Sequence, residues 1–338
     1  MQAIVYDRYG NADAMRIADV ATPEPGPGQV RIRVVAAAIN SWDWDLLHGI
    51  TFIRMESPLR PNKRILGCDV AGRVEAVGDG VTRLAVGEEV FGDISAAGWG
   101  GFAERVCTDE EALCRKPAGM GFLEAAALPQ AGVLALQGLR LCGEMGPGRQ
   151  LLIIGAGGGV GTFALQLAKQ AGSQVTVVDD ASKLERLRQL GADAVLDYRT
   201  EDFVSTGPYD FILDVVGRQS PRRCLRALTP DGRCIWVGAT PGYLVQLLAL
   251  IPLLRWTSRR RLALLLHKPQ RADLEQLSSM VECGELKPVI DRVCSLAEVP
   301  GEIERLGRGD VFGKVVAAVS EAIVNIRPPQ STTSESSE

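Results

Sequence analysis

Short apolar runs alternate with amphipathic segments through the second half of the chain. The first run, at 151–154, leads into a cluster of glycines and then into apolar residues at helical spacing, which are Ala164, Leu167, Ala168 and Ala171. Further apolar runs follow at 174–178, 194–196, 211–216 and 234–237, and a charged helical stretch separates the first two of these. Strands that alternate with helical stretches predict a parallel, doubly wound sheet of the α/β class.

The glycine cluster reads GAGGGVG over 155–161 and joins the first strand to the first helix. Gly158 allows the backbone to approach a pyrophosphate, and Gly161 allows the helix to pack closely on the strand; Ala156 replaces the first glycine of the G-x-G-x-x-G pattern. The free N–H groups at the start of the helix then face the phosphates. Asp179 follows at the spacing of an acidic residue that binds the adenosine ribose, although a helix cap is its plainer interpretation. Together these features predict a dinucleotide-binding site.

The N-terminal part of the chain, up to about residue 121, has a different pattern. Short strands with frequent Gly and Pro are expected at 1–6, 29–35, 69–77 and 88–91. This pattern predicts an all-β, barrel-like domain. A helical pattern at 123–141 leads from it to the nucleotide domain, and one more strand, at 314–319, is expected to return to the β domain.

Composition excludes some classes of protein. The net charge of −4 gives no electrostatic reason to expect a nucleic-acid partner. The eight cysteines are scattered without a C-x-x-C pair, and the chain opens on a strand pattern instead of a secretory signal. We therefore expect reduced thiols and a cytoplasmic protein.

An apolar segment at 243–256 departs from the α/β pattern. It is too short to span a bilayer and contains Pro252, and a basic cluster at 259–261 and a second apolar run at 262–266 follow it. A buried helix, a lid over the active-site cleft and a dimer contact are all consistent with this segment. A helix on a membrane surface is a further, less favoured, alternative.

Short motifs are spread from about residue 36 to residue 316. They are GCDVAG at 67–72, GEEVFG at 87–92, the glycine cluster at 155–161, LGA at 190–192, DY at 197–198, DVVG at 214–217 and GKVV at 313–316. As a set they resemble the medium-chain dehydrogenase/reductase superfamily, and within it the zinc-free quinone oxidoreductase-like branch. The resemblance implies a Rossmann doubly wound parallel sheet domain at 123–268 and a GroES-like β-barrel-type substrate domain at 1–122 and 269–320. It also implies a homodimer, and the polar residues 321–338 are expected to form a disordered tail.

Zinc-dependent members of that superfamily place a Cys and a His-Glu pair where this chain has Asn40 and Cys68-Asp69. The chain has two histidines, His48 and His267, and nothing in the sequence pairs either with Cys68. We therefore expect no metal. Without a Lewis acid, hydride transfer to a quinone, an enone or a similar activated double bond is the easier reaction. Two alternatives stay open: a pathway-specific enoyl reductase or dehydrogenase of secondary metabolism, and a non-catalytic nucleotide-binding redox sensor.

The resemblance also implies which residues meet the small-molecule substrate. Asn40 and Asp43 are the expected catalytic residues. Asn40 is placed to form a hydrogen bond with the nicotinamide ribose or a substrate oxygen. For Asp43 the alternative is a structural role, in which it holds the loop through backbone N–H groups. Ser41, Trp44 and His48 are expected to bind the substrate. Many relatives carry a Tyr where Ser41 stands, so the usual phenolic proton donor is missing and solvent is an alternative source of the proton.

The cofactor is NADPH or NADH. Asp179 favours NADH because it repels a 2′-phosphate, whereas Lys183 and Tyr198 match positions where NADPH-using relatives contact that phosphate. The preference is therefore left open at this point. The expected cofactor-binding residues are Gly158, Gly159, Val160, Gly161, Asp179, Lys183, Tyr198, Val216, Gly238, Ala239 and Lys314.

Overall fold

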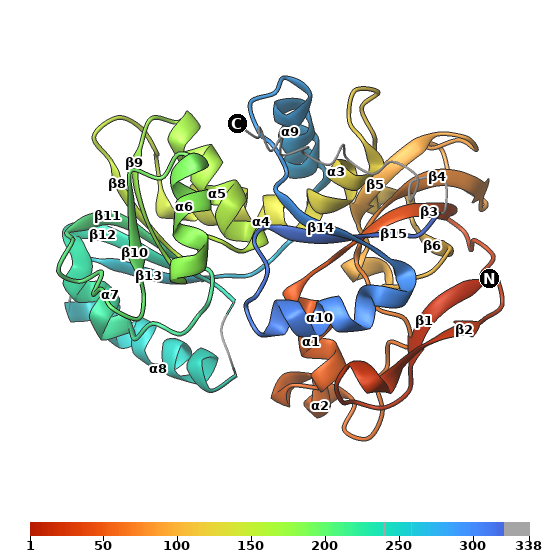
Figure 1. The fold of residues 1–338 in the computed structure, drawn as a ribbon, viewed down its shortest axis with the longest axis horizontal. Helices are drawn as coiled ribbons and strands as arrows, with labels where there is room; N and C mark the ends of the chain where they lie inside the picture. Colours follow the sequence, from red (N-terminus) through yellow and green to blue (C-terminus); the bar gives the residue numbers. More distant parts are fainter. Residues whose placement is uncertain (239–240, 258, 321–338) are drawn as a thin grey trace, which may run out of the picture.

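The computed structural model describes residues 1–238, 241–257 and 259–320 and shows two lobes, each built on a sheet (Figure 1). The strands of the first sheet are β8 (Gln150–Ile154), β9 (Gln174–Asp179), β10 (Ala194–Asp197), β11 (Tyr209–Asp214), β12 (Leu228–Val237) and β13 (Arg261–Leu265). They lie in the order β10-β9-β8-β11-β12-β13, and all neighbours are parallel. The strand order reverses between β8 and β11, which is where ligands bind in such sheets.

Helices cover both faces of this sheet. They are α4 (Pro129–Cys142), α5 (Gly159–Gln170), α6 (Ala181–Gln189), α7 (Pro221–Ala227) and α8 (Pro241–Thr257). Alternate residues of β8 enter different cores: Leu151 and Ile153 pack in one, and Leu152 and Ile154 in the other. The apolar run therefore has no polar face, as expected for a parallel strand buried on both sides.

The second lobe contains the barrel strands. They are β3 (Gln29–Ile39), β4 (Asp69–Val77), β5 (Glu89–Asp93), β6 (Arg105–Asp109), β7 (Leu113–Arg115), β14 (Ile290–Ser295) and β15 (Lys314–Ala318), with the separate pair β1 (Gln2–Tyr6) and β2 (Met15–Asp19). Its helices are α1 (Ser41–His48), α2 (Thr51–Glu56), α3 (Phe122–Ala127), α9 (Arg271–Glu282) and α10 (Val299–Gly307), with 3-10 turns at Ala12–Ala14, Ser95–Ala97, Glu110–Ala112 and Leu296–Glu298. The return of the last strand is confirmed, because β15 pairs antiparallel with β3.

Several expected elements differ in their bounds. The helix predicted at 123–141 is two helices, α3 and α4, which meet at Leu128 because Pro129 starts a new helix. The strand predicted at 211–216 ends at Asp214, since the turn after it begins there. The residues 262–266, grouped above with the apolar segment, belong mostly to β13, the sixth strand of the parallel sheet.

The apolar segment forms the helix α8, which packs against β13. The helix continues through Pro252 instead of ending there. Leu247 is buried, while Val245 and Leu248 are exposed. Among the described residues, none of the helices has both the length and the apolar character needed to cross a membrane. The predicted tail at 321–338 lies outside the described residues.

Candidate functional site

The glycine-rich loop lies between β8 and α5 at the carboxyl edge of the parallel sheet (Figure 1). A Cβ added to Gly161 would lie 2.5 Å from backbone atoms of Ala156, so only glycine allows α5 to pack this closely on the loop. Gly158 is the residue before α5, and the nearest atom to an added Cβ there is the Gly155 oxygen, 3.6 Å away. The Gly158 face of the loop is therefore open to a ligand at the start of a helix of twelve residues.

The turn after β11 lies beside this loop. A Cβ on Gly155 would lie 2.4 Å from Val216, which places Val216 next to the glycines. Asp214 holds the turn by accepting hydrogen bonds from the Val216 and Gly217 N–H groups at 3.0 and 2.9 Å, and burial raises the pKa of its carboxyl. The open face at Gly158 is a cradle that a side chain would fill, so these residues fit a dinucleotide.

Acidic and basic side chains meet at the end of β9. The Asp179 carboxylate accepts hydrogen bonds from the Gly157 N–H at 2.7 Å and from the Asp180 N–H at 2.8 Å, and Lys183 Nζ lies 3.5 Å from it. Asp179 thus supports the glycine-rich loop in addition to lying at the expected ribose position. Arg199, which sequence reasoning missed, pairs with Asp180 at 2.7 Å. The Arg199 guanidinium also lies 5.4 Å from the centre of the exposed Tyr198 ring.

Five buried side chains form what we call the polar cluster: Asn40, Cys68, Asp69, Gln130 and Lys314. Lys314 Nζ donates to the Ile39 carbonyl at 3.0 Å, to Asn40 Oδ1, and to Asp69 Oδ2 at 3.4 Å. Asn40 Nδ2 donates to the same Asp69 oxygen at 2.9 Å. Burial raises the pKa of Asp69 to about 6, although the Lys314 ammonium lowers it. The cluster is therefore a buried ion pair held by amide groups.

Lys314 also joins this cluster to the glycine-rich loop. A Cβ on Gly159 would lie 2.7 Å from Lys314 Cδ, so the lysine stem passes along the loop. The preceding Gly313 N–H donates to the Gly157 carbonyl at 2.8 Å. The expected cofactor-binding residue Lys314 thus contacts the loop through its stem, while its charged end points to Asn40 and Asp69.

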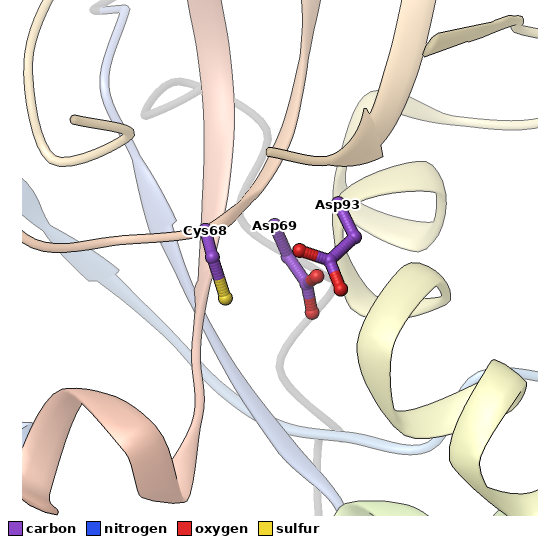
Figure 2. A group of neighbouring side chains, drawn as sticks. All are labelled: Cys68, Asp69 and Asp93. Atoms are coloured by element: carbon purple, nitrogen blue, oxygen red, sulfur yellow. The ribbon is translucent and has the colours of Figure 1, made fainter. Parts of the chain in front are cut away.

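Cys68, Asp69 and Asp93 have ligand-type atoms that all lie within 4.8 Å of one another, and Figure 2 shows the three side chains next to each other. Cys68 Sγ accepts hydrogen bonds from the side-chain amides of Asn40 at 3.4 Å and Gln130 at 3.3 Å. The main-chain N–H of Gln130 also donates to Asp69, at 3.1 Å. Burial raises the pKa of the Cys68 thiol well above its usual range.

These residues do not fit a zinc ion. Zinc takes thiolate, imidazole and carboxylate ligands, whereas two amide groups direct their hydrogens at the Cys68 sulfur. The Lys314 ammonium, paired with Asp69, supplies a positive charge at the place where a dication would need carboxylate oxygens. Asp93, the third residue of Figure 2, is engaged by His267, whose Nε2 lies 2.8 Å from Asp93 Oδ2.

Asp43 is fully buried and holds the backbone around Asn40. Its carboxylate accepts hydrogen bonds from the N–H groups of Asn40 and Gly67, both at 2.8 Å. Burial raises the pKa of Asp43 to about 7. These contacts match the structural role that was the alternative interpretation of Asp43, because its carboxylate positions the backbone of Asn40. Ser41, the first residue of α1, is exposed.

Two expected substrate-binding residues lie elsewhere. Trp44 and His48 stack on each other with ring centres 4.1 Å apart, on the side of α1 that contacts α10. His48 Nε2 lies 3.5 Å from Glu304, and the Trp44 ring packs against Gly307. The structure therefore does not bring this pair to the polar cluster. The residue of α1 on the site side is Trp42, whose ring lies edge-on to His267.

The remaining expected cofactor residues lie at the edge of the sheet or outside the described part. Gly238 directly follows β12, with a φ of +84° that favours glycine. Val160 belongs to the first turn of α5. Ala239 lies outside the described residues. His267, Asp93, Gln130 and Arg199 are the residues that sequence reasoning did not assign to the site.

Comparison with known proteins gives two family matches on different parts of the chain. A family model described as "Alcohol dehydrogenase GroES-like domain" matches residues 26–137, and one described as "Zinc-binding dehydrogenase" matches residues 190–316. A chloroplast envelope quinone oxidoreductase homolog of Arabidopsis thaliana is 32% identical over 338 residues, covering 94% of this chain and 98% of the relative. A 2-methylene-furan-3-one reductase of Solanum lycopersicum is 33% identical over 331 residues, covering 94% of this chain and 78% of the relative.

Solved structures include a quinone oxidoreductase from Coxiella burnetii with a TM-score of 0.86 and 31% identity, covering 95% of this chain and 99% of that one. The fold and the glycine-rich loop thus define an NAD(P)H-dependent oxidoreductase with a Rossmann domain and a GroES-like domain. The chain belongs to the medium-chain dehydrogenase/reductase superfamily, next to its quinone oxidoreductases.

Proposed function

We propose that this enzyme reduces quinones, enones or similar activated double bonds with NADPH and without a metal ion. The observation that carries the proposal is the polar cluster, because Lys314 and the two amides take the place that zinc needs. Two relatives in different plants are named a quinone oxidoreductase homolog and a 2-methylene-furan-3-one reductase, which supports this substrate class. A conjugated acceptor is electron-poor enough to take a hydride without a Lewis acid.

The residues divide the work between binding and orientation. The open backbone at Gly158 and the start of α5 bind the pyrophosphate. Asp43 fixes the backbone of Asn40, and Lys314 fixes its side chain, so the amide is held rigidly beside the cofactor loop. When bound, the reduced nicotinamide supplies the hydride. The stacked rings of Trp42 and Trp99 form an aromatic wall next to His267.

The preference for NADPH rests on the adenosine end of the site. The Asp179 oxygens are already engaged by two backbone N–H groups, which reduces its capacity to bind a ribose hydroxyl. Lys183 and Arg199 bring two positive charges to the same turn, next to the exposed Tyr198. This combination suits a 2′-phosphate better than a free ribose.

Homodimer formation and a cytoplasmic location stay predictions. Within the described residues β13 pairs with β12 only, so its other edge is free to pair with a second chain. Gel filtration with light scattering tests the dimer, and a monomer at micromolar concentration would contradict it.

The test of function is steady-state oxidation of NADPH and NADH with a panel of quinones and enones. We expect activity with both acceptor classes and a kcat/KM that is higher for NADPH. Activity confined to one acyl-thioester enone would favour the pathway-specific enoyl reductase. Tight cofactor binding without turnover of any acceptor would favour the non-catalytic sensor.

A further inference from the structure

A histidine and a carboxylate bridge the two lobes at the ligand-binding edge of the parallel sheet. Leu265, the last residue of β13, lies opposite Val237, the last residue of β12. His267 follows two residues later and so lies beyond the carboxyl edge of the sheet. Its Nε2 lies 2.8 Å from Oδ2 of Asp93, the last residue of the barrel strand β5. The side chains of His267 and Asp93 are only 6% and 5% exposed.

The second ring nitrogen of His267 has no partner. Nδ1 is buried and makes no hydrogen bond to any residue that the structure describes. Buried polar atoms are nearly always paired, so an unpaired one requires an explanation, such as a ligand that completes it. A carboxylate beside one nitrogen fixes the orientation of the ring and so fixes where the other nitrogen points. The other nitrogen is then an aimed proton donor.

The surroundings of His267 belong to the site described above. Its ring meets Trp42 edge-on, with ring centres 6.0 Å apart and planes at 87°. Trp42 is 42% exposed, stands two residues after Asn40, and stacks on Trp99 at 6.1 Å. The Asp93 carboxylate lies within 4.8 Å of the ligand atoms of Cys68 and Asp69 (Figure 2). His267 thus lies between the stacked rings of Trp42 and Trp99 and the polar cluster.

We propose that His267 is the proton donor of the reduction and that Asp93 is its positioning residue. The proposal rests on the proposed function. For an enone, the hydride leaves a C–H bond of the reduced cofactor and forms a C–H bond at the β-carbon. The C=C electron pair then forms a double bond between the α-carbon and the carbonyl carbon, and the C=O pair moves onto the oxygen. The Nδ1–H bond of the imidazolium then breaks, its electrons stay on Nδ1, and the proton goes to that oxygen. The products are the enol, which tautomerises to the ketone, and the oxidised cofactor.

The proton is replaced through a cavity of about 220 Å³ that both His267 and Asp93 line. Asp109, Glu111 and Arg271 lie on its wall, so water in this cavity meets charged groups. Cys68 and Asp69 also lie close to Asp93, and the Lys314 ammonium lies 3.4 Å from Asp69.

The experiment compares an enone with an ortho-quinone, because a quinone is the stronger hydride acceptor and its reduction depends less on an acid. His267→Gln should lower kcat for the enone about 100-fold, a typical value for a lost general acid. Its KM for NADPH should stay unchanged, and its rate with the ortho-quinone should fall less than about fivefold. Asp93→Asn should lower the enone rate about tenfold. The control Asp7→Asn, which removes one carboxylate from an exposed ion pair with Arg16, should have no effect.

Chemical rescue distinguishes proton donation from structural support. His267→Ala should regain part of its enone activity with added imidazole but not with added guanidinium. An enone rate within threefold of wild type in His267→Gln, or equal losses with both acceptors, would overturn the proposal. If His267→Gln does not fold, Asp93→Asn carries the same comparison. A wild type that reduces neither acceptor would instead refute the proposed function.

Discussion

Replacing either of two glycines in the glycine-rich loop by alanine adds one methyl group, and the two variants should differ in effect. Gly158→Ala should weaken cofactor binding, whereas Gly161→Ala should lower stability. Gly158 has φ −83° and ψ 174°, a conformation that any residue adopts, and an added Cβ there would meet no atom closer than 3.6 Å. Gly158→Ala should therefore fold with an unchanged midpoint of thermal unfolding. Its methyl group points into the open face of the loop, where the pyrophosphate must approach.

The expected loss in affinity follows from the hydrogen bonds that this approach provides. A backbone N–H that binds a charged phosphate contributes about 1.5–3 kcal/mol. Losing one such bond at the start of α5, which the Gly158 methyl group would obstruct, corresponds to a Kd for the reduced cofactor that is about 30-fold higher. Fluorescence titration of NADPH measures this change. A bulkier Gly158→Val should abolish binding.

Gly161→Ala adds the same methyl group to the same loop but should lower stability. An added Cβ there would lie 2.5 Å from Cα and O of Ala156, whereas carbon atoms in contact need about 3.5 Å. The helix α5 must then move away from the loop, at a cost of about 1–3 kcal/mol. The midpoint of thermal unfolding should fall. Unchanged NADPH affinity in Gly158→Ala, or equal unfolding midpoints in the two variants, would refute the assignment of this loop.

Three further predictions concern the metal, the cofactor and pH. Exhaustive chelation should leave activity unchanged, because amides and an ammonium engage Cys68 and Asp69; stoichiometric zinc whose removal abolishes activity would contradict this. Lys183→Ala should lower kcat/KM for NADPH about tenfold and leave kcat/KM for NADH unchanged. Asp179→Ser should lower kcat/KM for both cofactors, because Asp179 also accepts a hydrogen bond from the Gly157 N–H. Since burial raises the pKa of Asp43 to about 7, its contribution to stability is present below about pH 4 and is lost as the pH rises to about 7. Urea unfolding at pH 5 and pH 8 should show this fall in the free energy of unfolding of the wild type and a smaller fall in Asp43→Asn. The variant should also be less stable at both pH values, because one of the two N–H groups loses its acceptor.

Periodicity predicted most strands, because each is bounded by glycine or proline. The expected strand at 69–77 has the bounds of β4. The strand β13 was missed because its short apolar run was grouped with the apolar segment that forms α8, although the basic residues 259–261 separate the two. The break between α3 and α4 was readable, since a Pro such as Pro129 favours the first position of a helix.

The site was less predictable than the fold. Glycines of a phosphate loop are neighbours in sequence, so their pattern is local. Cys68, Asp93 and His267 come from the ends of different strands, and no spacing along the chain indicates that they meet. For α1 a signal did exist: Trp44 and His48 are four residues apart and share one face of the helix, so Trp42 had to point elsewhere.

Lys314 supplies the polar cluster with a positive charge that is part of the chain. A metal site has its positive charge only when it is loaded, whereas an ammonium that is part of the chain is present as soon as β15 joins the barrel. The same side chain holds Asn40 and Asp69 at its charged end and lies along Gly159 with its stem. Any shift of the cofactor loop therefore moves the group that orients Asn40. The glycine-rich loop and the polar cluster are thus joined by one residue, whose buried charge is tolerated because carbonyl, amide and carboxylate groups surround it.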